Sequence, residues 1–166
     1  MAGAGEKAFC AGGDVKALFQ EGATIEDRLA FFRSEFQLDY HMSTISSVQI
    51  ANWDGIVMGG GFGVSAFAPF IIATENSMFA MPEAKLGFFT DVASSYLLSR
   101  LRSNIGYYLG LTGSRLKGEE VYLAGLANYF IRRDNLELAF RDLRDTLPKV
   151  DGNIKHHIHV VLSRYH

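Results

Sequence analysis

Residues 56–74 read IVMGGGFGVSAFAPFIIAT, an apolar stretch that contains three consecutive glycines. Residues 48–58, which lead into the glycines, predict extended chain broken by a turn at 52–55. Residues 62–68 predict a buried helix, and the apolar run 70–74 predicts a fully buried strand. Glycines in such apolar surroundings differ from those of flexible Gly/Ser linkers, and they indicate a backbone that turns sharply or lies close to a ligand.

Outward from this stretch, predicted strands alternate with predicted helices, which indicates the α/β class. Gly, Pro, Asn and Asp residues, which favour turns and helix ends, set the expected boundaries of these strands and helices. The remaining predicted elements are, in chain order, a turn at 75–76, a strand at 77–81, helices at 104–111 and 118–124, a strand at 129–131 and a helix from Asp134 that ends before Pro148.

A long helix is predicted from Thr24, with Asp27 at its third position. Its apolar side chains recur at three- and four-residue steps, and we expect this stripe to pack in the core: Ile25, Leu29, Phe32, Phe36 and Tyr40. A shorter helix is expected before it, capped by Asp14 and closed by Gly22. Residues 156–159 alternate like a strand, and their three histidines lack acidic neighbours, so we expect no metal site there.

The chain has 166 residues, 48% hydrophobic and 20% charged, enough for one domain with its own core. Its 16 basic and 18 acidic residues give a net charge of −2, without the basic cluster that nucleic-acid binding needs. The single cysteine, Cys10, excludes an intramolecular disulfide framework and a cysteine-based zinc site. No apolar run approaches the roughly 18 residues that span a bilayer. The N-terminus does not resemble a signal or transit peptide, so we expect a soluble intracellular chain.

Two glycine-bearing loops each lead into a predicted helix, one at Gly12-Gly13 and one at Gly59-Gly60-Gly61. N–H groups at a helix start have no partner within the helix, and the helix dipole favours negative charge there. Two such groups aimed at one point form an oxyanion hole, although each loop alone is also compatible with close packing. Neither loop has the glycine spacing of dinucleotide sites or the lysine of the Walker motif.

Glu83 and Asp91 lie eight residues apart in the apolar segment MPEAKLGFFTD, residues 81–91. An ionised carboxylate in such surroundings is unfavourable unless it has a partner or a function. Two interpretations stay open on spacing alone. In the structural one, Asp91 caps a helix that runs to residue 102, and Glu83 pairs with Lys85 or an arginine. In the functional one, the two acids perform acid–base chemistry.

Five segments, in chain order, resemble motifs of the crotonase (enoyl-CoA hydratase/isomerase) superfamily. They are FCAGGD at 9–14, MGGG at 58–61, FAMPE at 79–83, LTG at 111–113 and AGLA at 124–127. The resemblance covers about residues 3–131 and implies the crotonase-like spiral of ββα units, as one domain over residues 1–166. Family proteins have further strands before the first loop and further helices after the last. The chain is therefore expected to be an internal portion of a longer protein, poorly soluble or dependent on association by itself.

The resemblance also indicates a branch of the superfamily. Enoyl-CoA hydratases carry a catalytic glutamate two residues after the third glycine, where this sequence has Gly63, whereas their second glutamate is kept as Glu83. Aspartate at position 91, where most hydratases have glycine, is characteristic of the 3-hydroxyisobutyryl-CoA hydrolase branch. That branch also commonly places a glutamate on the helix before the second loop, matched by Glu35. Thr90 departs from the branch's usual proline and leaves the loop less rigid.

Hydrolysis of a short β-hydroxyacyl-CoA thioester is the activity that the resemblance implies, foremost that of 3-hydroxyisobutyryl-CoA in valine breakdown. The N–H groups of Gly13 and Gly60 would form the oxyanion hole. Glu83 would act as nucleophile or general base, and Asp91 would position the water or acyl group and share proton transfer. The substrate-binding residues would be Glu35, Ala11 and Lys16, with Lys16 reaching the phosphates or pantothenate of CoA.

No cofactor is implied, since CoA arrives as part of the substrate, and no metal, nucleic acid or membrane partner is expected. Assembly into a homo-oligomer stays open, and the family resemblance implies a mitochondrial location. Two alternative functions also stay open. One is enoyl-CoA hydration or isomerisation, with Gly63 arguing against hydration; the other is a catalytically silent acyl-CoA-binding fragment.

Overall fold

Tight turns at Asp54-Gly55 and Glu75-Asn76 each carry the chain from one small sheet into another. The computed structural model describes all of residues 1–166. Each turn separates two short strands, and the strand before it lies in a different sheet from the strand after it. These strands are β2 (Ile50–Trp53) and β3 (Ile56–Met58), then β4 (Phe70–Ala73) and β5 (Met78–Ala80).

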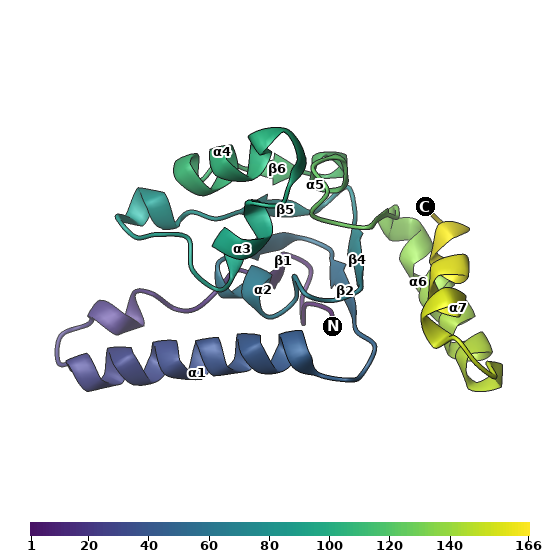
Figure 1. The fold of residues 1–166 in the computed structure, drawn as a ribbon, viewed down its shortest axis with the longest axis horizontal. Coiled ribbons are helices and arrows are strands. Elements are labelled where there is room, and N and C mark those ends of the chain that lie inside the picture. Colours follow the sequence, from purple (N-terminus) through teal and green to yellow (C-terminus); the bar gives the residue numbers. More distant parts are fainter.

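Two sheets result, and both are largely parallel. One has the order β1-β3-β5-β6, with β6 antiparallel to β5, and the other has the order β2-β4-β7. The remaining strands are β1 (Ala8–Cys10), β6 (Leu116–Lys117) and β7 (Tyr129–Phe130). Because strand pairs alternate with helices and feed both sheets, the chain winds as repeated ββα units (Figure 1), which confirms the expected fold class.

Besides α1, described below, four short helices lie between the strands and complete these units. They are α2 (Gly60–Gly63), α3 (Ser94–Leu98), α4 (Ile105–Thr112) and α5 (Glu119–Leu123). The predictions for α4 and α5 are confirmed, with Gly113 left-handed at the end of α4. The predicted helix at 62–68 begins earlier and is regular for only four residues. None of the helices in the structure combines the length and hydropathy needed to cross a membrane.

The main core lies between the two sheets and the helices α2 to α5. Trp53, Phe62 and Phe79 are almost fully buried there and pack on one another with ring centroids 5.2–6.4 Å apart. The Trp53 indole N–H donates to the Ser65 hydroxyl at 2.9 Å, which satisfies its polar atom inside the core. This packing fixes the strand ends from which the glycine loops emerge.

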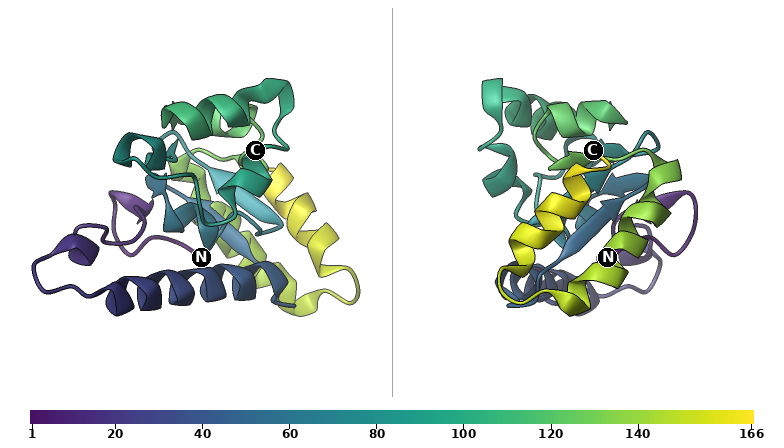
Figure 2. Two further views of the ribbon diagram at one scale, coloured as in Figure 1. Left: turned by 60° about the vertical axis from the view of Figure 1, so that its left-hand side comes forward. Right: turned by 90° about the vertical axis from the view of Figure 1, so that its right-hand side faces the viewer.

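A second core joins the β2-β4-β7 sheet to α6 (Arg133–Thr146) and α7 (Ile154–Ser163), which lie together across that sheet in Figure 2. Leu136 and Leu143 of α6 are buried, and Phe140 is half-buried. Two predictions are wrong here. Arg132 rather than Asp134 is the cap residue of α6, and residues 156–159 are helical, because Ile158, Val161 and Leu162 bury one helical face.

Helix α1 (Ile25–Thr44) runs along one side of the molecule, at the lower edge of Figure 1. Thr24 and Asp27 form the predicted capping box. The predicted core stripe is wrong: Ile25 is 67% exposed and Tyr40 71%. The face that points inward is instead the one formed by the residues just before those of the stripe. On this face Phe31 and Glu35 are half-buried and Asp39 is buried. The apolar stripe predicted the wrong face because the inward face of α1 includes two acidic residues, Glu35 and Asp39.

Short 3₁₀ helices occupy four of the connections: Ala17–Phe19, Glu83–Leu86, Arg102–Asn104 and Leu147–Lys149. Asp14 accepts a hydrogen bond from the Ala17 N–H at 3.2 Å, at the start of the first of these helices. That helix ends before the predicted stop at Gly22.

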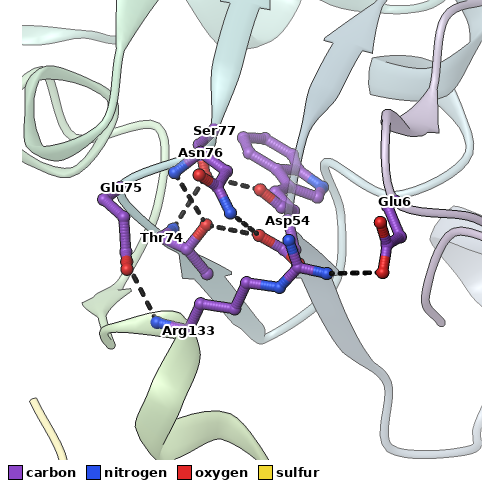
Figure 3. A network of polar contacts seen from close by, with 8 residues as sticks. Glu6, Asp54, Thr74, Glu75, Asn76, Ser77 and Arg133 are labelled. Atoms are coloured by element: carbon purple, nitrogen blue, oxygen red, sulfur yellow. Dashed lines mark hydrogen bonds and ion pairs between the residues drawn. The ribbon is translucent and has the colours of Figure 1, made fainter.

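A polar network fastens the start of α6 to the two turns (Figure 3). Asp54 Oδ1 accepts hydrogen bonds from the Thr74 hydroxyl at 2.7 Å and the Asn76 amide at 3.2 Å. Asp54 Oδ2 lies 3.3 Å from Arg133 Nε, and the Arg133 backbone N–H donates to Glu75 at 2.9 Å. Each carboxylate oxygen of Asp54 therefore has a partner.

Candidate active site

A cavity of about 510 Å³ lies where α1, the two glycine loops and the segment after β5 meet. It brings together six of the seven residues that the sequence assigned to the site: Ala11, Gly13, Glu35, Gly60, Glu83 and Asp91. Lys16 is exposed and does not line the cavity, although its neighbour Val15 does. The contact of Lys16 with CoA stays a prediction.

The two glycine loops lie against each other. A Cβ atom at Gly60 would sit 3.8 Å from the Gly13 nitrogen, and one at Gly12 would sit 3.3 Å from the Gly60 nitrogen. Gly60 is the first residue of α2, and neither its N–H nor that of Gly13 has an acceptor in the protein. Gly59 adopts φ 50° and ψ −126°, a conformation that side chains rarely tolerate. Two adjacent, unused N–H donors thus line one cavity.

Three glycines of the second loop and α2 each face a carboxylate. A Cβ at Gly59 would lie 3.5 Å from Glu83 Oε1, and one at Gly60 would collide with Glu35 Oε1. A Cβ at Gly63 would lie 2.8 Å from both oxygens of Asp39. The acidic side chains therefore approach the backbone of this loop and of α2 closely, and at Gly63 a side chain would also collide with Val92.

Glu83 does not form the pair that its structural interpretation required. It opens the 3₁₀ helix Glu83–Leu86, is 7% exposed and has one oxygen, Oε2, without a partner. Lys85 instead donates to the Gly113 carbonyl at 3.0 Å. No arginine lies within ion-pair distance of Glu83, so that interpretation is wrong.

Asp91 does not cap α3 either. The cap position is Ala93, and no side chain caps this helix. Only the Asp91 carbonyl is used, accepting from the Ser94 N–H at 2.8 Å and the Ser94 hydroxyl at 2.6 Å. The Asp91 carboxylate is therefore available to the cavity.

The backbone next to Asp91 is strained. Val92 and Ala93 have φ values of 44° and 60°, in the left-handed region that non-glycine residues rarely adopt. Such conformations persist only where the surroundings enforce them, and they concentrate at functional sites. Val92 is almost fully buried, so packing holds this loop in place and fixes the direction of Asp91.

Four carboxyl groups without a cation form what we call the acidic cluster: Glu35, Asp39, Glu83 and Asp91. No Lys, Arg or His lines the cavity. Burial, and then the nearby Asp91 charge, raises the pKa of Glu83 to about 7. Burial, followed by the charges of Asp91, Asp39 and Glu83, raises the pKa of Glu35 to about 7. Burial also raises the pKa of Asp91. Glu35 and Glu83 are therefore poised to exchange protons near neutral pH.

Asp39 is the member of the cluster that the sequence analysis missed. It lies four residues after Glu35 on α1, and that spacing puts both acids on one helical face, a signal that was available in the sequence. Asp39 and Asp91 also line a second cavity of about 380 Å³. Aromatic rings form the apolar wall of the first cavity, with Phe32 and Phe88 stacked at a centroid distance of 6.0 Å.

The chain is similar to known proteins over nearly its whole length. The sequence pattern of the Enoyl-CoA hydratase/isomerase family matches residues 1–166. A mitochondrial 3-hydroxyisobutyryl-CoA hydrolase of Dictyostelium discoideum is 41% identical over all of this chain and 45% of its own length. The small ribosomal subunit protein mS47 of Neurospora crassa is 43% identical over 96% of this chain and 32% of its own length.

Among solved structures, a carnitinyl-CoA dehydratase from Mycobacterium thermoresistibile superposes with a TM-score of 0.81 at 31% identity. That match covers 98% of this chain and 45% of the other protein. The chain therefore spans less than half the length of the proteins it matches here.

Proposed function

Because the chain belongs to the enoyl-CoA hydratase/isomerase family, we propose that the full-length protein hydrolyses a β-hydroxyacyl-CoA thioester, 3-hydroxyisobutyryl-CoA, to 3-hydroxyisobutyrate and free CoA. One observation carries the proposal: Glu83 and Asp91, both free of structural partners, line the same cavity as two unused N–H donors. The name of the Dictyostelium relative supports the substrate. It also supports a mitochondrial location.

In this mechanism the thioester oxygen accepts hydrogen bonds from the N–H groups of Gly13 and Gly60. These donors stabilise the negative charge that develops when the carbonyl carbon is attacked, and one such donor typically contributes ~2.7–4 kcal/mol to transition-state stabilisation. The two loops lie so close to each other that both N–H donors are held in one place. No donor has to be reoriented during the reaction.

Glu83 supplies the attack, as the nucleophile or as the base that activates water. A carboxyl group with a pKa of about 7 is partly ionised at neutral pH yet basic enough to accept a proton. Asp91 shares the proton transfer, and the CoA thiolate leaves with a proton. Glu35, beside Gly60, contacts the acyl group. No cofactor enters this scheme, because water and the thioester balance the reaction.

The two roles of Glu83 are separable in a single turnover in H₂¹⁸O. Direct attack by Glu83 forms an anhydride, and its hydrolysis by water at the Glu83 carbonyl leaves ¹⁸O in the enzyme. General-base catalysis places ¹⁸O only in the released acid. Label found by mass spectrometry in the peptide that contains Glu83 would therefore establish direct attack.

The proposed reaction is tested by offering the full-length protein 3-hydroxyisobutyryl-CoA and crotonyl-CoA. Thiol release from the first substrate, without loss of the enoyl absorbance of the second, is the expected result. Asp91→Asn should nearly abolish thiol release while CoA-ester binding persists. Hydration of crotonyl-CoA without thiol release from either substrate would instead support the hydratase alternative.

A second candidate is a non-catalytic role, and the likeness to a ribosomal subunit protein favours it. In that case neither substrate reacts, and the protein co-sediments with mitochondrial ribosomal particles. Four neighbouring carboxyl groups without a cation argue for catalysis, since such a cluster reduces the stability of a purely structural protein.

A further inference from the structure

Residues 14–23 connect the first glycine loop to α1 and form part of the cavity wall. Three side chains of this 14–23 segment, those of Val15, Leu18 and Phe19, line the cavity that contains the two N–H donors. Leu18 is 8% exposed, whereas the Phe19 side chain is 68% exposed. In Figure 1 the segment is the purple stretch that passes through a short helix before the start of α1. It therefore supplies an apolar wall of the site without being packed inside the protein.

Few contacts hold the 14–23 segment to the rest of the protein. Its own backbone N–H groups donate only within the segment or to the Gly13 carbonyl. None of its charged side chains forms an ion pair. Nothing lies within 4 Å of where a Cβ atom at Gly22 would be. One hydrogen bond joins the segment to another element: the Arg28 Nε–H donates to the Leu18 carbonyl at 2.8 Å.

Arg28, in the first turn of α1, contacts the segment in two ways. Besides the hydrogen bond to the Leu18 carbonyl, its guanidinium carbon lies 5.0 Å from the centroid of the Phe19 ring, which is within cation–π range. The backbone of Arg28 is fixed, since its N–H donates to the Thr24 carbonyl at 3.3 Å. No acidic side chain lies within ion-pair distance of the guanidinium. Arg28 thus joins the 14–23 segment to a rigid helix.

We propose that Arg28 is a positioning residue for CoA-ester binding, because it fixes the cavity wall formed by Leu18 and Phe19 to α1. The inference rests on the proposed function in that a CoA ester must occupy this cavity. Arg28 itself does not line the cavity, so it acts through the segment that it holds. A wall that is already in place loses less conformational entropy when the ester binds, and the affinity is higher for that reason.

The chemical step should depend much less on Arg28 than binding does. The oxyanion donor Gly13 precedes the 14–23 segment and is held from another side, because a Cβ atom at Gly13 would lie 2.5 Å from the Cζ atom of Phe31. Glu83 and Asp91 come from a different part of the chain, after β5. Loss of Arg28 therefore leaves the reacting groups in place and loosens only the wall.

The first test measures binding of S-isobutyl-CoA, a thioether that cannot be hydrolysed, to full-length Arg28→Ala protein. We expect the Kd to rise roughly three- to tenfold, as for the loss of one hydrogen bond. With the thioester substrate, KM should rise while kcat stays within about twofold of wild type. Arg33→Ala, which changes an exposed arginine on the same helix, is the matched control and should alter none of these values. A lower kcat with an unchanged Kd would overturn the inference.

Direct contact of Arg28 with the phosphates of CoA would weaken binding as well, and S-isobutyl-pantetheine, which lacks these phosphates, separates the two explanations. If Arg28 acts through the 14–23 segment, Arg28→Ala should reduce the affinity for both compounds by the same factor. A reduction confined to S-isobutyl-CoA would show a phosphate contact and overturn the positioning role.

Amide hydrogen exchange tests the role of Arg28 without ligand or turnover. Exchange of the amides in residues 14–23 should be roughly three- to tenfold faster in Arg28→Ala than in the wild type and in Arg33→Ala. Unchanged exchange in this segment would overturn the inference, because Arg28 would then not hold it. A wild-type protein that binds S-isobutyl-CoA but releases no thiol from the thioester overturns only the proposed function.

Discussion

Asp54 and Glu83 are both acidic residues that follow a short strand, β2 and β5 respectively, and they meet opposite surroundings. The oxygens of Asp54 are shared among Thr74, Asn76 and Arg133, in the network of Figure 3. Glu83 is more deeply buried, yet its Oε2 has no hydrogen-bond donor. The charged group that acts on Glu83 is another acid, Asp91.

The two residues represent two kinds of carboxylate: one that stabilises the fold and one that is present although it does not. A buried acid with donors and a counter-ion can contribute to stability, whereas an unpartnered one reduces it. The acidic cluster is therefore a local weakness in the structure that the rest of the core compensates. Substitutions in the two regions should accordingly separate stability from activity.

The largest effect is expected on activity, from Glu83→Gln. Loss of the attacking or basic carboxylate should lower kcat for thiol release by roughly 10²–10⁴-fold. Thermal unfolding should at the same time occur at an equal or higher temperature, because a buried partnerless charge is gone. Enzyme kinetics and calorimetry on the same preparation check both parts. A Glu83→Gln protein that is inactive and also less stable would show that Glu83 belongs to the stabilising class.

The next effect is a fall in stability as pH rises. Glu83 has a pKa of about 7 in the folded protein against an ordinary 4.5, so between these values the folded state binds more protons than the unfolded state. Stability contributed by the protonated form is then lost as pH rises from about 4.5 to 7, by about 3 kcal/mol for an isolated group. Chemical denaturation across this range should show the decline in the wild type and a flatter curve in Glu83→Gln. A rise in stability over the same range would contradict the assignment.

On the other side of the comparison, Asp54→Ala should lower stability and spare catalysis. The change leaves the Thr74 hydroxyl and the Asn76 amide without their acceptor and removes the partner of Arg133 Nε. We expect a loss of about 2 kcal/mol in the free energy of unfolding, with kcat within about twofold of wild type. Asp151→Ala, an exposed acid without contacts, is the control and should change neither. A loss of turnover in folded Asp54→Ala protein would mean that the network also supports the site.

Much of the fold was predictable because its signals are local. Turn-forming residues predicted the turns after β2 and β4, and an apolar run predicted the buried strand β4. Glycines at their ends helped to predict the helices α4 and α5. The orientation of α1 was not predictable in this way, since its apolar stripe is the more regular pattern and yet lies exposed. Phe31, Glu35 and Asp39 instead lie against Gly13, Gly60 and Gly63 respectively, and the periodicity of α1 carries no information on such distant residues.

The candidate site shows the same division. Motif resemblance led to the two glycine loops, Glu83 and Asp91, and the structure brings them together in one cavity. Spacing alone could not decide whether Asp91 was a helix cap, because that depends on the left-handed conformation of Val92 and Ala93, which the residue types disfavour. Asp39 was missed although its spacing from Glu35 was a signal, because its burial depends on Gly63, a residue 24 positions away that lacks a side chain.

The smallest expected effect concerns the strain beside Asp91 and uses Ala93→Gly. Ala93 adopts φ 60° at the cap position of α3, where glycine has no steric penalty. The substitution should therefore raise the free energy of unfolding by up to about 1 kcal/mol, even though glycine increases the entropy of the unfolded chain. Ala30→Gly, at an exposed position within α1, is the matched control and should lower it by about 0.5–1 kcal/mol.

If Ala93→Gly raises the free energy of unfolding and Ala30→Gly lowers it, the backbone strain lies in the loop that carries Asp91. Because the relaxed loop holds Asp91 less firmly, kcat of Ala93→Gly should fall by a few-fold while that of Ala30→Gly stays unchanged. Denaturant unfolding and thiol-release kinetics measure the two quantities. Equal destabilisation by both substitutions would mean that the Ala93 backbone carries no strain, and that packing of Val92 alone directs the Asp91 carboxylate.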